Sequence, residues 1–325
     1  MSTPSIAAPP SNFHHYAKNF VQNAPYRTSK SGQMGLRQNT LRNYDNFLAV
    51  WSKFESQRGT SASLLDINQN FVLSFKQWLL HDCRYSVNNV SRLLSMLKTI
   101  CLDAQKNDIE THPYVNFIKS FGASRQEKII HTLTFNEIKK IETCQLPSSL
   151  ENTRKWLLIG CWVGQRVSDL LTLRPDQIRP AKNKGIYVDF QQKKTGKCVT
   201  VGVVNPKVIH ILTQDFPKKM YPEYFNKQLK CVLQKAGLTQ MVRAERYNGK
   251  IKRKEIGIFP KYAIIASHDL RRSFASNFYG KIPTPILMNM TGHARESSFL
   301  TYIGMDQKRD SFADEFMRGV AQIEL

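Results

Sequence analysis

Four short segments in the second half of the chain carry side chains that could act together on a phosphodiester. The segments are VGQRVSDLLTL, QQKKTGK, HDLRRSFASNF and TGHARESSFLTYIG. From them we take as candidate catalytic residues Arg166, Lys194, His268, Arg271, His293 and Tyr302. Arginine binds phosphate oxygens with a planar fork, histidine exchanges protons near neutral pH, and a tyrosine oxygen can form a covalent intermediate. The set predicts a metal-free attack of a tyrosine on phosphorus.

A metal-dependent nuclease built on His268, Asp269 and His293 is the competing chemistry. Asp269 follows His268 directly, and adjacent residues on a helix do not face each other. No second carboxylate is well placed in these segments. The sequence therefore predicts no metal site and no cofactor, and cleavage that persists in EDTA would separate the two chemistries.

The chain is strongly basic. Its 325 residues include 47 Lys and Arg against 25 Asp and Glu, which gives a formal net charge of +22. The excess is spread along the chain rather than gathered in one tail. Such a charge predicts a polyanionic partner, and we expect double-stranded DNA. No apolar run reaches the ~18 residues of a membrane span, so no membrane partner is expected.

The cysteines and the start of the chain indicate a cellular compartment. The 6 cysteines have no CxxC spacing, and the first residues lack the charged and apolar regions of a secretory signal. We therefore expect reduced thiols in a cytoplasmic protein.

Residues 36–120 predict a small helical bundle, because three of their segments carry apolar residues at helical spacing. The stripes are Leu41, Tyr44, Leu48, Trp51 and Phe54; Phe71, Phe75, Trp78 and Leu79; and Val90, Leu93, Leu94, Leu97, Cys101 and Ala104. Residues 1–35 are rich in Ser, Pro, Asn and Gly and contain no acids, so we expect a flexible lead there.

Residues 121–132 are expected to link this bundle to a second domain over residues 133–325. Thr134 and Glu137 form a capping box that opens a helix, and residues 151–173 favour another helix or a helix pair. GIYVDF and KCVTVGVV flank QKKTG, which predicts an antiparallel β-hairpin with Lys194 between its strands. The fold class is therefore mainly α, with a small antiparallel hairpin or sheet.

A basic loop is expected near the middle of the second domain, before the segment HDLRRSFASNF. It either contacts DNA phosphates or is only a solvated surface. Its candidate DNA-binding residues are Arg243, Arg246, Lys250, Lys252, Arg253 and Lys254.

Taken in order, the four segments resemble the motif boxes of the tyrosine recombinase, or phage integrase, family. VGQRVSDLL resembles the first arginine box, HDLRRSFA the His-x-x-Arg box and TGH the Leu-Gly-His box, with Tyr302 nine positions after His293. Val163, Asp169 and Thr291 stand where Thr, Glu and Leu are common in the family. None of these departures removes a reactive group. The resemblance spans most of the chain and implies an active enzyme of the bacterial mobile-element type.

The resemblance implies a role for each candidate side chain. Arg166 and Arg271 would stabilise charge on the phosphate oxygens, and Tyr302 would attack phosphorus. His268 would act as general base, and His293 would hydrogen-bond the phosphate.

A lysine of the predicted hairpin would protonate the departing 5′ oxygen. The resemblance assigns this role to Lys194, with Lys193 and Lys197 as alternatives, because hairpin length varies in the family.

The resemblance also implies a function. The protein would be a site-specific DNA recombinase that cuts and rejoins DNA through a 3′-phosphotyrosyl intermediate, without metal or ATP. We expect integration or excision of a mobile element. A DNA invertase, a chromosome-resolution recombinase and a non-catalytic DNA-binding protein that retains the fold are the alternatives.

The implied assembly is a tetramer on two DNA sites, with accessory DNA-bending or directionality factors and association with the nucleoid. The N-terminal bundle would be the family's core-binding domain. Apolar residues at helical spacing predict a C-terminal helix, which would pack on its own domain or dock on a neighbouring protomer. They are Phe312, Phe316, Val320 and Ile323.

Overall fold

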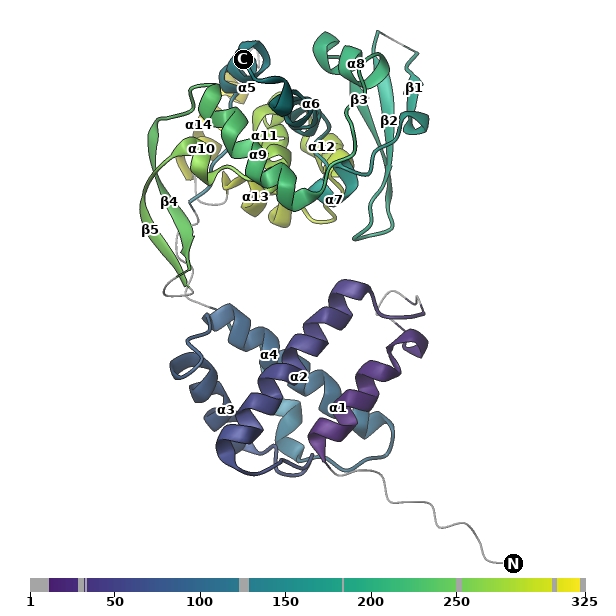
Figure 1. Cartoon of the computed structure of the whole chain (residues 1–325), viewed down its shortest axis with the longest axis vertical. Coiled ribbons are helices and arrows are strands. Elements are labelled where there is room, and N and C mark those ends of the chain that lie inside the picture. Colours follow the sequence, from purple (N-terminus) through teal and green to yellow (C-terminus); the bar gives the residue numbers. More distant parts are fainter. Residues whose placement is uncertain are drawn as a thin grey trace, which may run out of the picture. The chain divides into compact units, whose positions relative to one another are not determined.

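The computed structural model forms two compact units, shown in Figure 1. One unit comprises residues 1–126 together with residues 249–253, and the other comprises residues 127–248 and 254–325. The described residues are 12–28, 32, 34–122, 129–182, 184–249, 253–305 and 309–321.

The N-terminal unit is a helical bundle. Its elements are α1 (Phe13–Gln22), η1 (Ala24–Tyr26), α2 (Gln38–Arg58), α3 (Gln69–His81), α4 (Val87–Lys106) and η2 (Pro113–Phe117), where η marks a 3-10 helix. Asn12, Asn68 and Ser86 cap α1, α3 and α4, since each side chain accepts a hydrogen bond from the backbone N–H three residues on. Helices α2, α3 and α4 match the three predicted apolar stripes.

Helix α1 contradicts the expected flexible lead for part of residues 1–35. The segment FHHYAKNFVQ has apolar residues at helical spacing, and they pack into the bundle core. The buried residues of this face are Phe13, Tyr16, Ala17 and Phe20. The Ser- and Pro-rich composition around this short stripe hid it from sequence analysis. Residues 1–11 lie outside the described part of the chain.

Aromatic side chains dominate the core of the N-terminal unit. Trp51 is fully buried, and its ring centroid lies 4.2 Å from that of Phe13, 5.2 Å from Phe75 and 5.7 Å from Phe71. Its indole N–H is buried and has no hydrogen-bond partner among the described residues. The ring packing must therefore outweigh the loss of that hydrogen bond to water.

We expect Trp51→Ala to lower the free energy of unfolding by about 3–5 kcal/mol, because it leaves a large cavity among these rings. Trp51→Phe keeps one ring and removes the unpaired N–H, so its loss should be much smaller. Urea denaturation followed by circular dichroism measures both, with Leu73→Ala at a half-exposed position as control. Equal losses in Trp51→Ala and the control would contradict the packing argument.

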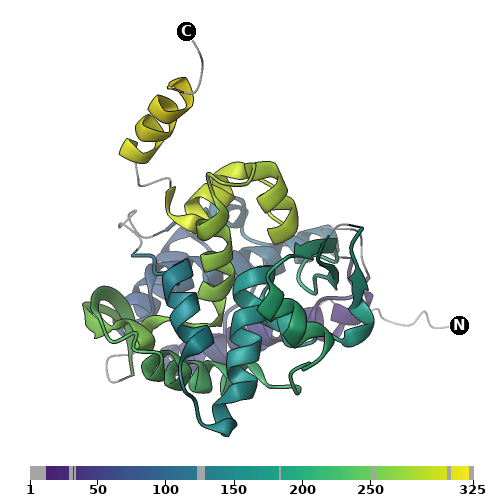
Figure 2. The same cartoon turned by 90° about the horizontal axis from the view of Figure 1, so that it is seen from above.

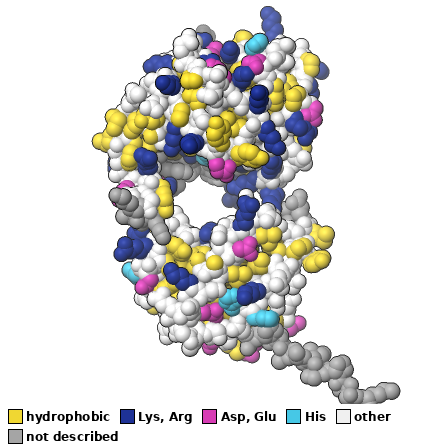
Figure 3. All heavy atoms as spheres, in the orientation of Figure 1, with side chains coloured by type: hydrophobic (Ala, Val, Ile, Leu, Met, Phe, Trp, Pro, Cys, Tyr) yellow, Lys and Arg dark blue, Asp and Glu magenta, His cyan; other side chains and the backbone are white. Residues whose placement is uncertain are grey.

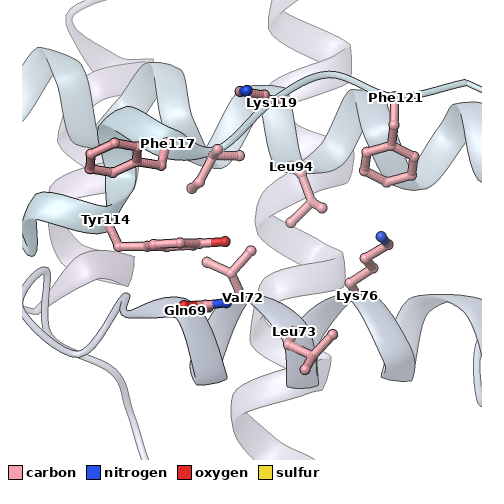
Figure 4. A pocket seen from close by; sticks show the side chains of 10 residues that line it. Gln69, Val72, Leu73, Lys76, Leu94, Tyr114, Phe117, Lys119 and Phe121 are labelled. Carbon is pink, nitrogen blue, oxygen red and sulfur yellow. The ribbon is translucent and has the colours of Figure 1, made fainter.

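An open pocket of about 250 Å³ lies between α3 and the segment around η2 (Figure 4). Figure 4 shows Val72 on α3 pointing toward this segment. The Lys76 ammonium lies 4.4 Å from the centroid of the Phe121 ring, a cation–π contact. This contact joins Phe121 to α3.

The C-terminal unit is mostly helical and contains the predicted catalytic residues. Its helices are α5 (Phe135–Thr143), α6 (Ser148–Val163), α7 (Val167–Leu170), η3 (Pro175–Gln177), α8 (Pro206–Thr213), α9 (Pro222–Lys235), α10 (Lys261–Ile264), α11 (Ser267–Phe278), α12 (Thr284–Thr291), α13 (Glu296–Ile303) and α14 (Arg309–Val320). The capping box of Thr134 and Glu137 is present at the start of α5. Helix α6 lies in the core and packs against α5, α8, α9 and α11.

The predicted hairpin is part of a three-stranded antiparallel sheet, with strand order β1-β2-β3. The strands are β1 (Ile178–Pro180), β2 (Ile186–Gln191) and β3 (Cys198–Val203). Strand β2 pairs with β3 from Ile186 opposite Val203 to Gln191 opposite Cys198. Figure 1 shows this sheet at one side of the unit, beside α8. The pairing places the lysine-containing turn at the end of a rigid ladder.

The prediction of a basic loop is wrong, because two further strands form in this segment. They are β4 (Met241–Asn248) and β5 (Arg253–Pro260), which pair as a two-stranded ribbon. Valine, isoleucine, tyrosine and phenylalanine in these strands favour extended structure, and Asn248-Gly249 is a turn signal between them. The high density of charge on this segment obscured both signals.

Candidate active site

The structure brings five of the six predicted catalytic residues together: Arg166, His268, Arg271, His293 and Tyr302. The ring centroids of His268 and His293 lie 5.2 Å and 5.1 Å from that of Tyr302. The positive charge of Arg271 lies close enough to Tyr302 to oppose a rise in the pKa of the tyrosine. Four positions in the unit supply the site: the start of α7, the β2–β3 turn, α11, and the segment from the end of α12 to α13.

Arg271 is the buried cation of the site, with 1% of its surface exposed. Its guanidinium donates to the carbonyl of Gly164 at 3.0 Å and to the carbonyl of Thr291. These carbonyls lie at the C-terminal ends of α6 and α12, where helices lack internal partners. Burial and the nearby Arg166 lower the pKa of Arg271 to about 10, so it stays charged at neutral pH. The site therefore has a fixed positive charge.

Gly164 lets α6 turn sharply just before the first catalytic arginine. Its φ is +63°, a left-handed conformation that favours glycine. A Cβ atom at this position would lie 2.3 Å from Cδ1 of Phe274. The turn and the close packing on α11 both require glycine here.

Arg166 is oriented by buried amides that sequence analysis missed. Its Nη1 donates to Oε1 of Gln192 at 2.9 Å, and Gln192 Nε2 donates to Gln165 Oε1 at 3.1 Å. Gln165 Nε2 in turn donates to the carbonyl of Met290 at 2.8 Å. Gln192 is completely buried, and a Cβ on Gly292 would lie 2.5 Å from its Oε1. These amides tie the first arginine to the β2–β3 turn and to the end of α12.

The turn between β2 and β3 places its lysines next to this network. Lys193, Lys194 and Lys197 are all exposed. The Lys193 backbone N–H donates to Oδ1 of Asp169 at 3.1 Å, and the Thr195 hydroxyl donates to Oε1 of Gln192 at 3.0 Å. The backbone N–H just before Lys194 is therefore bonded to α7, which directly follows Arg166, and the hydroxyl just after Lys194 shares the Gln192 oxygen with Arg166.

Tyr302 is partly buried, and burial raises its pKa to about 12. The charges of Arg271 and Arg272 oppose this rise. Its hydroxyl donates to the backbone carbonyl of His268 at 3.3 Å. The tyrosine is therefore protonated at neutral pH and must lose its proton before or during an attack.

His293 is held neutral. Burial, followed by the charges of Arg271 and Arg166, lowers its pKa to about 4. The Thr291 hydroxyl donates to the carbonyl of Leu287 at 2.6 Å and lies 2.8 Å from Nδ1 of His293. Because that hydroxyl proton is used, the network assigns the His293 proton to Nδ1. Nε2 is left as an acceptor until the imidazole is protonated.

The lowered pKa of His293 predicts a loss of stability in acid. Between pH 6.5, the ordinary value, and about 4, the unfolded chain binds a proton at this residue that the folded chain does not. The free energy of unfolding should therefore fall as pH is lowered through this range, and it should fall less in His293→Gln. Urea denaturation of both proteins across the range is the measurement. Identical pH dependence in the two proteins would contradict the prediction.

The chain matches two family models, one in each unit. The model described as the phage integrase SAM-like domain matches residues 12–121, and the phage integrase family model matches residues 131–309. The second match alone covers more than half of the chain. This protein belongs to the phage integrase family, the tyrosine recombinases. The resemblance found in the motif boxes is confirmed, and the integrase is an enzyme of the site-specific recombinase class.

Solved structures share the fold of the integrase at low sequence identity. A lambda integrase(75-356) dimer bound to a COC′ core site has a TM-score of 0.63 and 16% identity, covering 89% of this chain and 94% of that chain. XerH site-specific recombinase bound to palindromic difH substrate has a TM-score of 0.60 and 14% identity, covering 94% and 95%. The Tn1549 transposon integrase in complex with circular intermediate DNA has a TM-score of 0.58 and 12% identity, covering 90% and 95%. No curated protein sequence matches the chain. These likenesses confirm the mainly α fold class.

The three departures of the integrase from the common family pattern all have contacts in the site. The Val163 carbonyl accepts a hydrogen bond from Gln165 at 3.0 Å. Asp169 fixes the lysine turn, and Thr291 contacts both Arg271 and His293. Oδ2 of Asp169 is buried with no hydrogen-bond partner among the described residues, so this carboxylate is only half satisfied.

The candidate DNA-binding residues of the integrase lie on the β4–β5 ribbon. Arg243 and Arg246 are on β4, where the Arg246 guanidinium lies 5.5 Å from the centroid of the Phe259 ring. Arg253 and Lys254 are on β5, and Lys254 pairs with Glu245 at 2.9 Å. Lys250 and Lys252 lie outside the described residues. Figure 3 shows Lys and Arg side chains spread over the visible faces of both units rather than confined to one element.

A metal site and a membrane span would need features that the described residues do not provide. Among them, no group of three or more His, Cys, Asp and Glu side chains is arranged to hold a metal ion. Within the same residues, no helix is long and apolar enough to cross a membrane.

Proposed function

We propose that the integrase cuts and rejoins double-stranded DNA through a 3′-phosphotyrosyl intermediate formed by Tyr302. The observation that carries this proposal is the position of the Tyr302 side chain, which lies near the buried cation Arg271 and against the rings of His268 and His293. A tyrosine beside a fixed cation is suited to attack an anionic phosphate.

The cleavage step requires charge stabilisation and two proton transfers. Arg166 and Arg271 stabilise the charge that develops on the non-bridging oxygens as the Tyr302 oxygen forms its bond to phosphorus. The bond from phosphorus to the 5′ oxygen breaks, and Lys194 supplies the proton to that oxygen. The ester energy stays in the phosphotyrosyl bond, so a 5′ hydroxyl can reverse the reaction on the same or another strand.

The proton of Tyr302 is proposed to leave through His268. This histidine is exposed, and its ring lies near that of Tyr302, so it can pass the proton to solvent. His293 is proposed to hydrogen-bond the phosphate. A bound phosphate would offset the charges of the two arginines that hold His293 neutral, which would allow Nε2 to become a donor.

The proposed biological reaction is integration or excision of a mobile element. The lambda integrase and the Tn1549 transposon integrase, which share the fold, support this assignment. Lambda integrase is also described as a tetramer bound to a Holliday junction, which supports a tetrameric recombination complex here.

Helix α14 is proposed to join neighbouring subunits in such a complex. Phe316 and Met317 on this helix are exposed, and Figure 2 shows α14 extending away from the other helices. The C-terminal unit has an apolar hollow of about 300 Å³ that could receive α14 of another copy. It is lined by Trp162, Gly202, Val204, Phe274, Phe278, Ile282, Ile286, Leu287 and Met290.

A suicide-substrate trap tests the proposed function. The integrase is incubated in EDTA with nicked duplexes that tile the DNA on both sides of its own gene, and covalent adducts are resolved on a denaturing gel. We expect an adduct in EDTA, with the DNA attached to the peptide that contains Tyr302. An adduct that requires a divalent metal, or no adduct on any duplex that the protein binds, would contradict the proposal.

DNA binding should weaken steeply with salt, because phosphate contacts release counterions. For 6–10 phosphate contacts, we expect the affinity to fall by about 10³–10⁵-fold between 50 and 200 mM salt. Fluorescence anisotropy with a labelled duplex measures the slope. A flat response would contradict the role assigned to the net charge of +22.

A further inference from the structure

Arg272, which follows the catalytic Arg271 on α11, contacts the proposed nucleophile in two ways. Its Nε donates to the backbone carbonyl of Tyr302 at 3.0 Å. Its Cζ lies 5.0 Å from the centroid of the Tyr302 ring. The charge of Arg271 also acts on the hydroxyl of the same tyrosine. Two consecutive arginines therefore act on one residue, Arg272 through direct contacts and Arg271 through its charge.

Asp269 fixes the Arg272 guanidinium. Its Oδ1 accepts a hydrogen bond from Arg272 Nη1 at 2.5 Å, and its Oδ2 accepts one from the backbone N–H of Ala266 at 2.9 Å. The side chains of Arg272 and Asp269 are only 10% and 15% exposed. A partly buried ion pair attached to the first turn of α11 has little freedom to move.

The Tyr302 carbonyl is one that a helix end leaves without an internal partner. Helix α13 ends at Ile303, and Gly304 follows with a φ of +77°. The last four carbonyls of a helix lack intrahelical partners, and a cation near them is favourable. Arg272 supplies both the donor and the charge at the turn of α13 that carries the nucleophile.

We propose that Arg272, oriented by Asp269, is a positioning residue that holds Tyr302 in its attacking position. We call this pair the nucleophile clamp. This proposal rests on the proposed function, because it assigns the clamp to a tyrosine that attacks phosphorus. The Arg272 guanidinium lies against the Tyr302 ring and favours the phenolate over the phenol. Its charge is one of those that oppose the raised pKa of Tyr302.

Two substitutions separate the position of Arg272 from its charge. Arg272→Gln removes both the charge and the guanidinium fork, whereas Arg272→Lys keeps a charge and removes the fork. Arg174→Gln is the matched control, since Arg174 is an exposed arginine paired with Asp176 two residues on.

The first measurement is the single-turnover rate of adduct formation as a function of pH. We expect Arg272→Gln to react about 10²-fold more slowly, on the scale of a small misplacement of a reacting group. The midpoint of its alkaline limb should move to higher pH, because the phenolate has lost a nearby cation. Arg272→Lys should be slowed with little change in that midpoint. The clamp would be overturned if Arg272→Gln lost rate only in proportion to its loss of folded protein and the midpoint of its alkaline limb did not move.

The second measurement does not depend on cleavage. Hydrogen exchange should be about tenfold faster in peptides covering α13 in Arg272→Gln than in wild type, and unchanged in Arg174→Gln. Unchanged exchange in α13 would overturn the clamp even if the enzyme is active. Faster exchange together with a wild-type protein that forms no adduct would support the clamp as a holder of α13 and contradict only the proposed function.

Discussion

Tyr302→Phe is expected to bind DNA as tightly as wild type and to form no covalent adduct. The substitution removes one oxygen, the proposed nucleophile. It keeps the ring, whose centroid lies 5.2 and 5.1 Å from the ring centroids of His268 and His293 and 5.0 Å from Cζ of Arg272. The lost hydrogen bond to the His268 carbonyl is long, at 3.3 Å, so the loss of stability should stay within about 1 kcal/mol.

The matched control is Tyr279→Phe, at the C-terminal end of α11 and outside the proposed machinery. This variant should form the adduct at the wild-type rate. Both variants and wild type are compared by anisotropy for binding and by the suicide substrate for cleavage. An adduct that persists in Tyr302→Phe would show that another residue attacks the phosphate.

The order of the chemistry-bearing residues along the chain was sufficient to predict the active-site candidates. Most of the candidates lie at a helix end or a turn, where a short string of residues also sets the local backbone, whereas Arg271 lies within α11. Gly164 before Arg166 and Gly292 before His293 are examples, since both have positive φ. Such local signals can be read from the sequence because the chemistry and the turn occupy the same few positions.

The contacts that orient those candidates could not be predicted in the same way. Gln192 lies 26 residues from Arg166, and its burial follows only from the pairing of β2 with β3. Arg271 and Arg272 are adjacent residues of the same type. Only the packing of α11 decides which of them donates to the carbonyls of Gly164 and Thr291 and which contacts the tyrosine backbone.

Composition misled the analysis at two elements. Helix α1 has a buried face of apolar residues, but it lies in a segment whose average composition is typical of disorder. The β4–β5 ribbon carries enough charge to suggest a loop, although its two strands contain valine, isoleucine, tyrosine and phenylalanine. In both places a few local residues were a better guide than the composition of the surrounding window.

Arg271→Lys is expected to slow cleavage by about 10²–10³-fold, comparable to the loss of an oxyanion-stabilising donor and equivalent to about 2.7–4 kcal/mol. The guanidinium donates to the carbonyls of Gly164 and Thr291 at the same time, and its charge lies near Tyr302. A lysine ammonium is a point charge on a flexible stem and cannot reproduce this forked arrangement.

The charge itself is also at risk in Arg271→Lys. Burial and Arg166 already lower the pKa of the arginine to about 10. A lysine begins roughly two units lower than an arginine, so the same surroundings would bring its titration toward neutral pH. The variant should therefore lose further activity as pH rises, because the ammonium loses its proton while the wild-type guanidinium keeps its charge. Single-turnover cleavage across pH measures this, with circular dichroism and DNA affinity to verify folding and Arg174→Lys as an exposed control. A folded Arg271→Lys that cleaves within threefold of wild type would remove Arg271 from the proposed site.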